Sequence, residues 1–151
     1  MTRTDRASRI IKASPRTIYC AFVDPAALSA WLPPPGMTAK VHAFEPRAGG
    51  SYRMTLSYDD ATTRGKTAAN EDVVEGTFLE LAPDERVVQR VEFASDDPAF
   101  AGAMTMTWSL RPVPAGTEVT ILCEGVPSGI RKEDHDAGLR STLANLAAFV
   151  E

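Results

Sequence analysis

The sequence has few of the residues that build metal centres and redox sites. Only two of its 151 residues are cysteines and two are histidines. Cys20 and Cys123 form no C-x-x-C pair, and their apolar neighbours predict small buried side chains. No ligand spacing is typical of zinc, and no G-x-G-x-x-G, Walker or G-x-S-x-G motif is present. We therefore expect no metal, nucleotide or covalent cofactor.

Long apolar runs and a basic stripe are also missing. No stretch reaches the roughly 18 apolar residues of a membrane helix, and the N-terminus lacks the apolar segment of a secretory signal. The net charge is −4. Residues 1–16 hold five bases against one acid, whereas residues 59–97 hold eleven acids against four bases. We expect a cytoplasmic protein with no membrane span and no nucleic-acid partner, because nucleic-acid binding needs a basic surface.

The apolar pattern predicts one domain over residues 1–151. A strand at 5–14 precedes two short helices at 14–24 and 25–32, each beginning with a capping residue followed by proline. An alternation with a period of two then predicts six strands in an antiparallel meander, at residues 37–46, 49–60, 72–81, 85–94, 103–113 and 117–126.

The last twenty residues return to a helical period. Leu139, Leu143, Leu146 and Val150 fall on one stripe of a helix from about Lys132 to Glu151. The apolar face of the sheet must be covered, and this helix is the long amphipathic element available to cover it. We therefore predict an α+β helix-grip fold, in which a curved antiparallel sheet wraps around a long C-terminal helix and two short helices follow the first strand.

Five stretches in a fixed order carry a family resemblance. They begin "IKASPRTIYCAFVDPAALSAWL", "RAGGSYRMTL", "VEGTFLELAPDERVV", "MTWSLRPVPAGTEVTILCEGVP" and "DHDAGLRSTLANLAAFVE", at residues 11, 47, 74, 106 and 134. Together they resemble the START-like (SRPBCC) superfamily, which includes the birch-pollen allergen. Within it they resemble the family named for the C-terminal domain of the activator of Hsp90 ATPase.

The resemblance implies a cavity between sheet and long helix, often used for hydrophobic ligands. Members include binders, lipid carriers, cyclases and chaperone partners, so the fold implies no particular reaction. The family usually places a tryptophan after the glycine of the terminal helix, whereas here Leu139 follows Gly138. This departure predicts a roomier cavity at that end.

The candidate cavity residues share an inward position on a strand or on a helix that closes the sheet. Methionine adapts to irregular space and aromatic rings form rigid walls, although plain core packing is the simpler explanation for any single residue. The candidates are Trp31, Tyr52, Met54, Leu56, Phe78, Met104, Met106, Trp108, His135, Leu139 and Leu143.

Two candidates have a specific expected place. Trp31, before the prolines at 33–35, is expected at the cavity mouth, and the alternative is a helix-packing anchor. His135 lies beside Asp134 and Asp136, whose carboxylates favour its protonated form. It is either a general base at the cavity or, more simply, an exposed residue at the helix start.

Three functions remain open from the sequence. The leading hypothesis is binding of a small hydrophobic or amphipathic molecule, such as a lipid. The second, suggested by the family name, is a co-chaperone or stress-related partner-binding module, with a chaperone or homodimer contact. The third is a cyclase- or hydrolase-type enzyme, which needs two converging ionisable groups where the sequence offers His135 alone.

Overall fold

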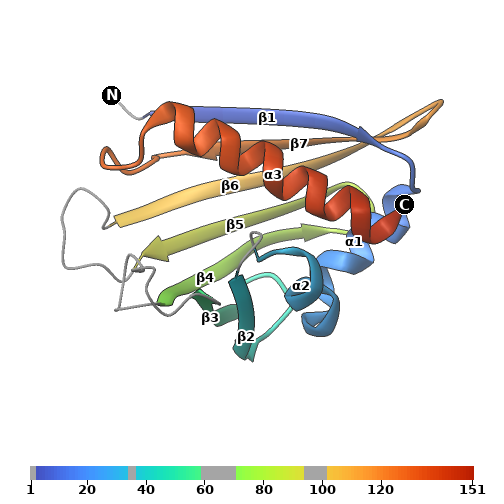
Figure 1. Ribbon diagram of the computed structural model, residues 1–151. Coiled ribbons are helices and arrows are strands. Elements are labelled where there is room, and N and C mark those ends of the chain that lie inside the picture. The colour runs from blue at the N-terminus through green and yellow to red at the C-terminus, as the bar shows by residue number, and fades with distance from the viewer. Residues whose placement is uncertain (1–2, 34–36, 59–70, 94–101) are drawn as a thin grey trace.

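The sheet is antiparallel throughout, and its two edges are the first two strands of the chain. The computed structural model describes residues 3–33, 37–58, 71–93 and 102–151. Within these ranges seven strands follow the spatial order β1-β7-β6-β5-β4-β3-β2 (Figure 1). The strands are β1 (Thr4–Ile11), β2 (Met37–Phe44), β3 (Ser51–Tyr58), β4 (Glu71–Ala82), β5 (Arg86–Phe93), β6 (Gly102–Val113) and β7 (Gly116–Glu124).

Two short helices carry the chain from one edge of the sheet to the other. In α1 (Pro15–Val23) the Ser14 side chain accepts a hydrogen bond from the Thr17 backbone N–H at 3.2 Å. In α2 (Pro25–Trp31) the Asp24 side chain does the same for Ala26 at 2.9 Å. Each cap satisfies a backbone donor that the helix leaves unpaired, and proline at the first position needs no partner. The predicted starts of both helices are confirmed.

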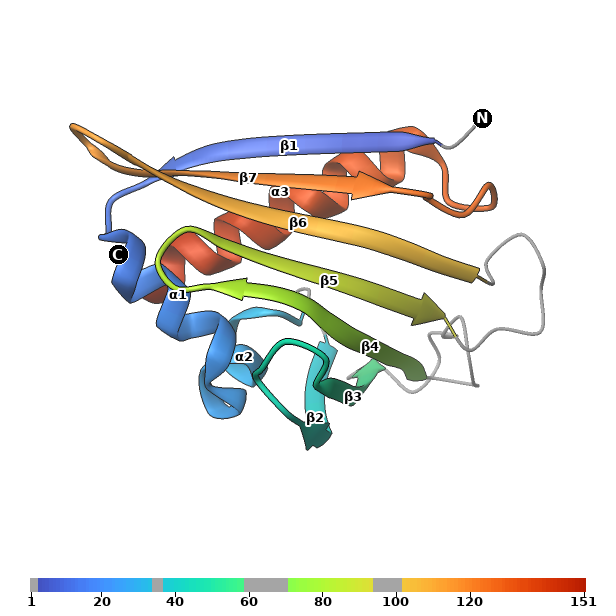
Figure 2. The same ribbon diagram turned by 180° about the vertical axis from the view of Figure 1, so that it is seen from behind.

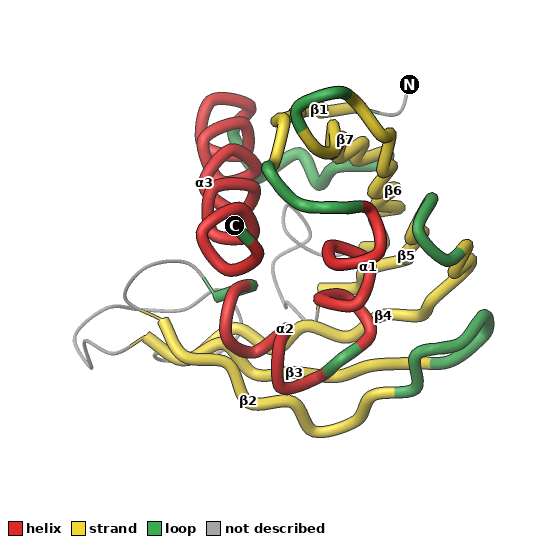
Figure 3. The backbone as a smooth tube through the Cα atoms, turned by 90° about the vertical axis from the view of Figure 1, so that its right-hand side faces the viewer, coloured by secondary structure: helices red, strands yellow, loops and turns green. Residues whose placement is uncertain are grey.

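The long helix α3 (Lys132–Val150) lies inside the curve of the sheet. Viewed end on, the strands bend around it from β1 to β2, with α1 and α2 at the near end (Figure 3). From behind, β1, β7 and β6 pass in front of α3, so the helices cover one face (Figure 2). Helix α3 packs along β1, and it also contacts α1 and α2. The predicted helix-grip architecture is confirmed.

The core follows the alternation of the strands. Val119, Ile121 and Cys123 of β7 are each 0 % exposed, and Trp108 of β6 is 2 % exposed. Leu139, Leu143, Leu146 and Ala147 are the buried residues of α3. The strand faces and the helical stripe therefore meet as predicted, with Val150 half-buried at the end of the stripe.

One predicted core residue is wrong. Cys20 is exposed, and Ala21 is buried in its place beside Ile18 and Phe22. Positions three and four residues after Ile18 return to its face of the helix, whereas Cys20, two residues on, points away. The prolines at 34 and 35 and the polar stretches at 61–70 and 96–101 lie outside the described residues.

We expect the contact between α3 and the sheet to contribute much of the stability. Replacing Leu143, which is 1 % exposed, by alanine should lower the free energy of unfolding by about 2–5 kcal/mol, because it leaves a cavity in the core. Urea denaturation measures the change. Leu79→Ala, at a side chain that is 48 % exposed, is the matched control and should cost well under half as much. Equal losses for the two variants would contradict the packing role of α3.

Candidate functional site

A cavity of about 310 Å³ lies between the inner face of the sheet and helices α2 and α3. Strands β3, β4, β5 and β6 form its floor, and the helices form its opposite wall. Its lining residues are Phe22, Leu28, Trp31, Leu32, Tyr52, Met54, Leu56, Val74, Gln89, Val91, Met104, Met106, Trp108, His135, Gly138, Leu139, Ser141 and Thr142.

Three aromatic rings meet edge to face at the end closed by α1 and α2. Phe22 lies 4.8 Å from Trp108 and 5.2 Å from Trp31, and the two tryptophans are 5.9 Å apart between ring centroids. The Trp31 indole N–H donates to the Ala21 carbonyl at 3.0 Å, and the Trp108 N–H donates to Gln89 Oε1 at 3.1 Å. Because both N–H groups are paired, the indoles offer the cavity their apolar surfaces.

Flexible and neutral side chains line the floor. Met54 and Met104 are buried, and Met106 is half-buried beside them. Burial raises the pKa of Tyr52, so its phenol stays neutral. Tyr52 pairs with Gly76 on β4, and a Cβ at Gly76 would lie 2.4 Å from the tyrosine ring. The glycine is therefore needed for the ring to lie across β4.

Helix α3 carries little side-chain volume at Gly138, where it lines the cavity. Gly138 is exposed, and a Cβ built there meets no atom within 4 Å. The neighbouring Thr142 hydroxyl donates to the Gly138 carbonyl at 2.9 Å, inside the helix. Leu139, 4 % exposed, fills the position where the resemblance implies a tryptophan. Small side chains on this part of α3 leave space above the floor.

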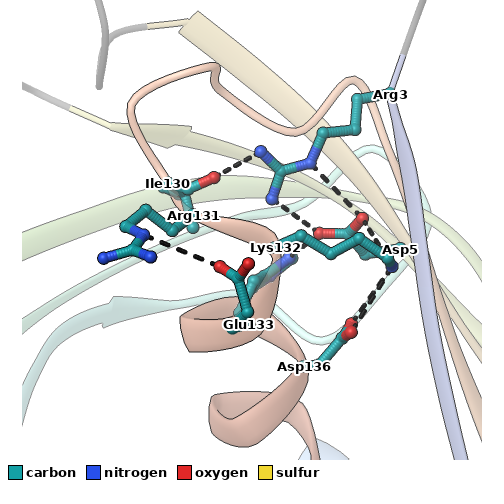
Figure 4. A network of polar contacts seen from close by, with 8 residues as sticks. Arg3, Asp5, Ile130, Arg131, Lys132, Glu133 and Asp136 are labelled. Atoms are coloured by element: carbon teal, nitrogen blue, oxygen red, sulfur yellow. Dashed lines mark hydrogen bonds and ion pairs between the residues drawn. The ribbon is translucent and has the colours of Figure 1, made fainter.

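A buried carboxylate supports the polar end of the cavity. The Asp5 side chain on β1 is 0 % exposed and lies 2.6 Å from His135 Nδ1, 2.8 Å from Arg3 Nη2 and 3.6 Å from Lys132 Nζ. Figure 4 shows Arg3 and Lys132 converging on Asp5 from β1 and the start of α3. Arg3 also donates to the Ile130 carbonyl, so the cluster joins β1 to the loop before the helix.

These contacts keep Asp5 ionised. The hydrogen bond from Arg3 is the main cause that lowers the pKa of Asp5 to about 2, burial opposes it, and the bond from His135 adds to it. An ionised carboxylate accepts hydrogen bonds and donates none, so Nδ1 of His135 carries the shared proton. Nε2 is then the ring nitrogen left for the cavity.

His135 is not the exposed residue of the simpler interpretation, because its side chain is only 13 % exposed. Its carboxylate partner is Asp5 on another element, not Asp134 or Asp136. Asp134 is exposed, and Asp136 pairs with Lys132 at 3.4 Å. By contrast, Glu75, Arg90 and Glu92 lie on the solvated outer face of the sheet and form exposed ion pairs.

The structure places most of the predicted site residues around the cavity. Phe78 and Leu143 are the exceptions, since both are buried in the core and neither lines the cavity. Phe78 packs against the rings of Phe44 and Tyr52, at 5.7 and 5.1 Å. The candidates on the cavity wall are Trp31, Tyr52, Met54, Leu56, Met104, Met106, Trp108, His135 and Leu139.

Sequence reasoning missed three polar residues of the cavity lining, Gln89, Ser141 and Thr142, and it missed Asp5 behind His135. Gln89 shares its strand face with Val87 and Val91, which are 0 % and 5 % exposed, so the alternation of β5 could have identified it. Asp5 is the one acid among the five bases of residues 1–16, which signals an ion pair but not its partner. That partner, His135, is 130 residues away in the chain.

Two other features bear on the site. Among residues 3–33, 37–58, 71–93 and 102–151, no group of three or more histidine, cysteine or carboxylate side chains could hold a metal ion. Within the same ranges no helix has the length and apolar character needed to cross a membrane.

Known proteins resemble the whole of this architecture. The family model described as "Activator of Hsp90 ATPase homolog 1-like protein" matches residues 12–151. Protein CV1439 from Chromobacterium violaceum is 34 % identical with a TM-score of 0.86, over 99 % of this chain and 98 % of that one. The AHSA1-like protein from Aeromonas hydrophila is 15 % identical with a TM-score of 0.76, over 98 % and 92 % of the two chains. No curated protein matches.

We expect the Asp5 cluster to make stability depend on acid pH. The carboxyl has a pKa of about 2 in the folded chain against an ordinary value of 3.8, so folding favours its ionised form. Its contribution, about 2 kcal/mol, is complete above the unfolded pKa and is lost as the pH falls from about 4 to about 2. Urea denaturation across this range measures it.

The Asp5→Asn variant supplies the comparison. Its free energy of unfolding should lie below that of the wild type at neutral pH, and the difference should shrink as the pH approaches about 2. Asp134→Asn removes an exposed carboxylate next to His135 on α3. It is the control and should leave the pH profile unchanged. A constant difference between wild type and Asp5→Asn at every pH would contradict the assigned ion pairs.

Proposed function

Because the chain belongs to the family of activator of Hsp90 ATPase homologue 1-like proteins, we propose that it uses the cavity of this fold to bind a small hydrophobic or amphipathic molecule. The fold alone names no ligand, since the same fold serves many functions. The proposal therefore depends on the cavity and on the residues that line it.

The observation that carries the proposal is the size of the cavity together with its apolar wall. The cavity of about 310 Å³ is partly open, so its apolar side chains face water until a ligand covers them, and covering them gains roughly 25 cal/mol per Å². About ten water molecules would occupy this volume, and the lining gives them few polar partners. The polar side chains of the lining are only Gln89, His135, Ser141, Thr142 and the Tyr52 hydroxyl, besides the paired indole N–H groups. An apolar ligand therefore fills this cavity more favourably than water does.

The cavity wall combines two fixed aromatic rings with three flexible methionine side chains. Trp31 and Trp108 are held by their hydrogen bonds, whereas Met54, Met104 and Met106 adapt their shape. Burial of ligand surface at roughly 25 cal/mol per Å², less the cost of association, supports micromolar affinity. We assign the nine predicted residues on the cavity wall to ligand binding.

A partner-binding function has less support. The exposed large apolar side chains of the described residues are Ile10, Leu79 and Phe149. They lie on β1, β4 and α3, and β1 and β4 are not neighbours in the sheet. A protein interface usually gathers such side chains into one patch.

Ligand binding should be visible in the tryptophan emission. Titration with fatty acids, with polycyclic phenols or with an environment-sensitive dye should change the emission of Trp31 and Trp108 and saturate in the micromolar range, because both rings line the cavity. Fluorescence spectroscopy measures the change. If no compound saturates and the protein instead captures a chaperone, the partner-binding function takes precedence.

Two variants locate the binding in the cavity. Leu139→Trp and Gly138→Leu each add volume at the α3 wall, and both should weaken the larger ligands first, by about tenfold or more. Leu79→Trp adds the same fluorophore at an exposed position of β4 and should leave affinity unchanged. Equal affinity for all three variants would place binding elsewhere on the protein.

A further inference from the structure

Gln89 offers the cavity a hydrogen-bond donor. The indole N–H of Trp108 is a donor only, so the group it meets at 3.1 Å must be the amide oxygen of Gln89. This bond fixes the orientation of the amide and turns its NH₂ group away from the indole. Within the described part of the chain no other group bonds to that NH₂. A half-buried donor on an apolar wall favours a ligand that places an acceptor against it.

His135 offers the opposite chemistry from the other wall. Its Nδ1–H is held by Asp5 at 2.6 Å, and Asp5 is itself held by Arg3 and Lys132. The ring is therefore fixed in one tautomer and one orientation. Nε2 has no hydrogen-bond partner among the described residues. A hydroxyl, which can both donate and accept, is the natural partner of this nitrogen whether or not it carries a proton.

The charges around His135 disfavour an anionic ligand at this end. Arg3 and Lys132 contribute two positive charges, and Asp5 and Asp136 contribute two negative charges. Figure 4 shows these four side chains gathered at the start of α3. Because these four charges offset each other, a carboxylate gains no net attraction from them, whereas a neutral hydroxyl needs only one hydrogen bond with Nε2.

Resting on the proposed function, we propose that the ligand is a neutral, compact apolar molecule that carries a carbonyl-type acceptor and a hydroxyl group. The amide NH₂ of Gln89 on β5 binds the acceptor, and Nε2 of His135 on α3 binds the hydroxyl. Trp31, Trp108 and the methionines enclose the apolar body between them. Asp5 is a positioning residue, because it contacts His135 and does not line the cavity.

Three probes with one two-ring skeleton separate the two polar contacts. Para-benzylphenol carries the hydroxyl alone, para-methylbenzophenone carries the carbonyl alone, and para-methyldiphenylmethane carries neither. Their dissociation constants are measured for the wild type, His135→Phe and Gln89→Met by fluorescence. The same buffer is used for all proteins and probes.

Each variant should affect one probe. Relative to the hydrocarbon, His135→Phe should weaken para-benzylphenol about tenfold and leave para-methylbenzophenone unchanged, as a single lost hydrogen bond predicts. Gln89→Met should weaken para-methylbenzophenone about tenfold and leave para-benzylphenol unchanged. In the wild type, para-benzylphenol should also shift the ¹⁵N resonance of His135 Nε2, which the hydrocarbon should not do. Circular dichroism of each variant checks that it is folded, and the two variants test the contacts independently.

The outcomes distinguish this inference from the proposed function. If all three probes saturate but both variants weaken them equally, the cavity binds ligands and the polar recognition is wrong. The same holds if the Nε2 resonance responds identically to phenol and hydrocarbon. If no probe saturates the wild type, the proposed function fails and the inference fails with it.

Discussion

One long helix has to cover the apolar face of seven strands, and the rest of the structure depends on this constraint. Seven strands spaced about 4.8 Å apart span roughly 30 Å, whereas a helix with its side chains is about 10–12 Å across. A flat sheet would leave most of its apolar face in water. The sheet instead curves around α3, and α1 and α2 close one end (Figure 3). The space that the single helix does not fill, above β3 to β6, is the cavity.

The position of α3 within this curve is set at both ends by polar contacts with the first strand and the residue after it. At its start, His135 and Lys132 meet the buried Asp5 of β1. At its end, the Glu151 carboxylate accepts a hydrogen bond from the Lys12 backbone N–H at 3.1 Å. These contacts hold the helix against β1 and away from the floor formed by β3 to β5. A buried ion pair of this kind specifies one arrangement, because an unpaired charge left there is costly.

The same cluster connects the fold to the chemistry of the site. Asp5 is needed to anchor the helix, and in doing so it leaves one nitrogen of His135 for the cavity. On the opposite wall, the bond between Trp108 and Gln89 orders an aromatic ring and an amide together. Both polar groups are thus ordered by protein partners before any ligand arrives. Such preorganisation reduces the entropy that binding would otherwise lose.

The sequence alone determined the element order and the face on which most strand side chains lie. Alternation with a period of two places Met104 and Trp108 inward because successive strand residues point to opposite sides, and the same rule applies to Gln89. The alternation could not separate cavity-wall residues from core residues, because Phe78 and Met54 both point inward. The rings of Phe44 and Tyr52 pack on Phe78, whereas Met54 lines the cavity. Nor could the alternation pair Asp5 with His135 across 130 residues. Local patterns record which way a side chain points, whereas the distance to its partner exists only once the sheet has curved around the helix.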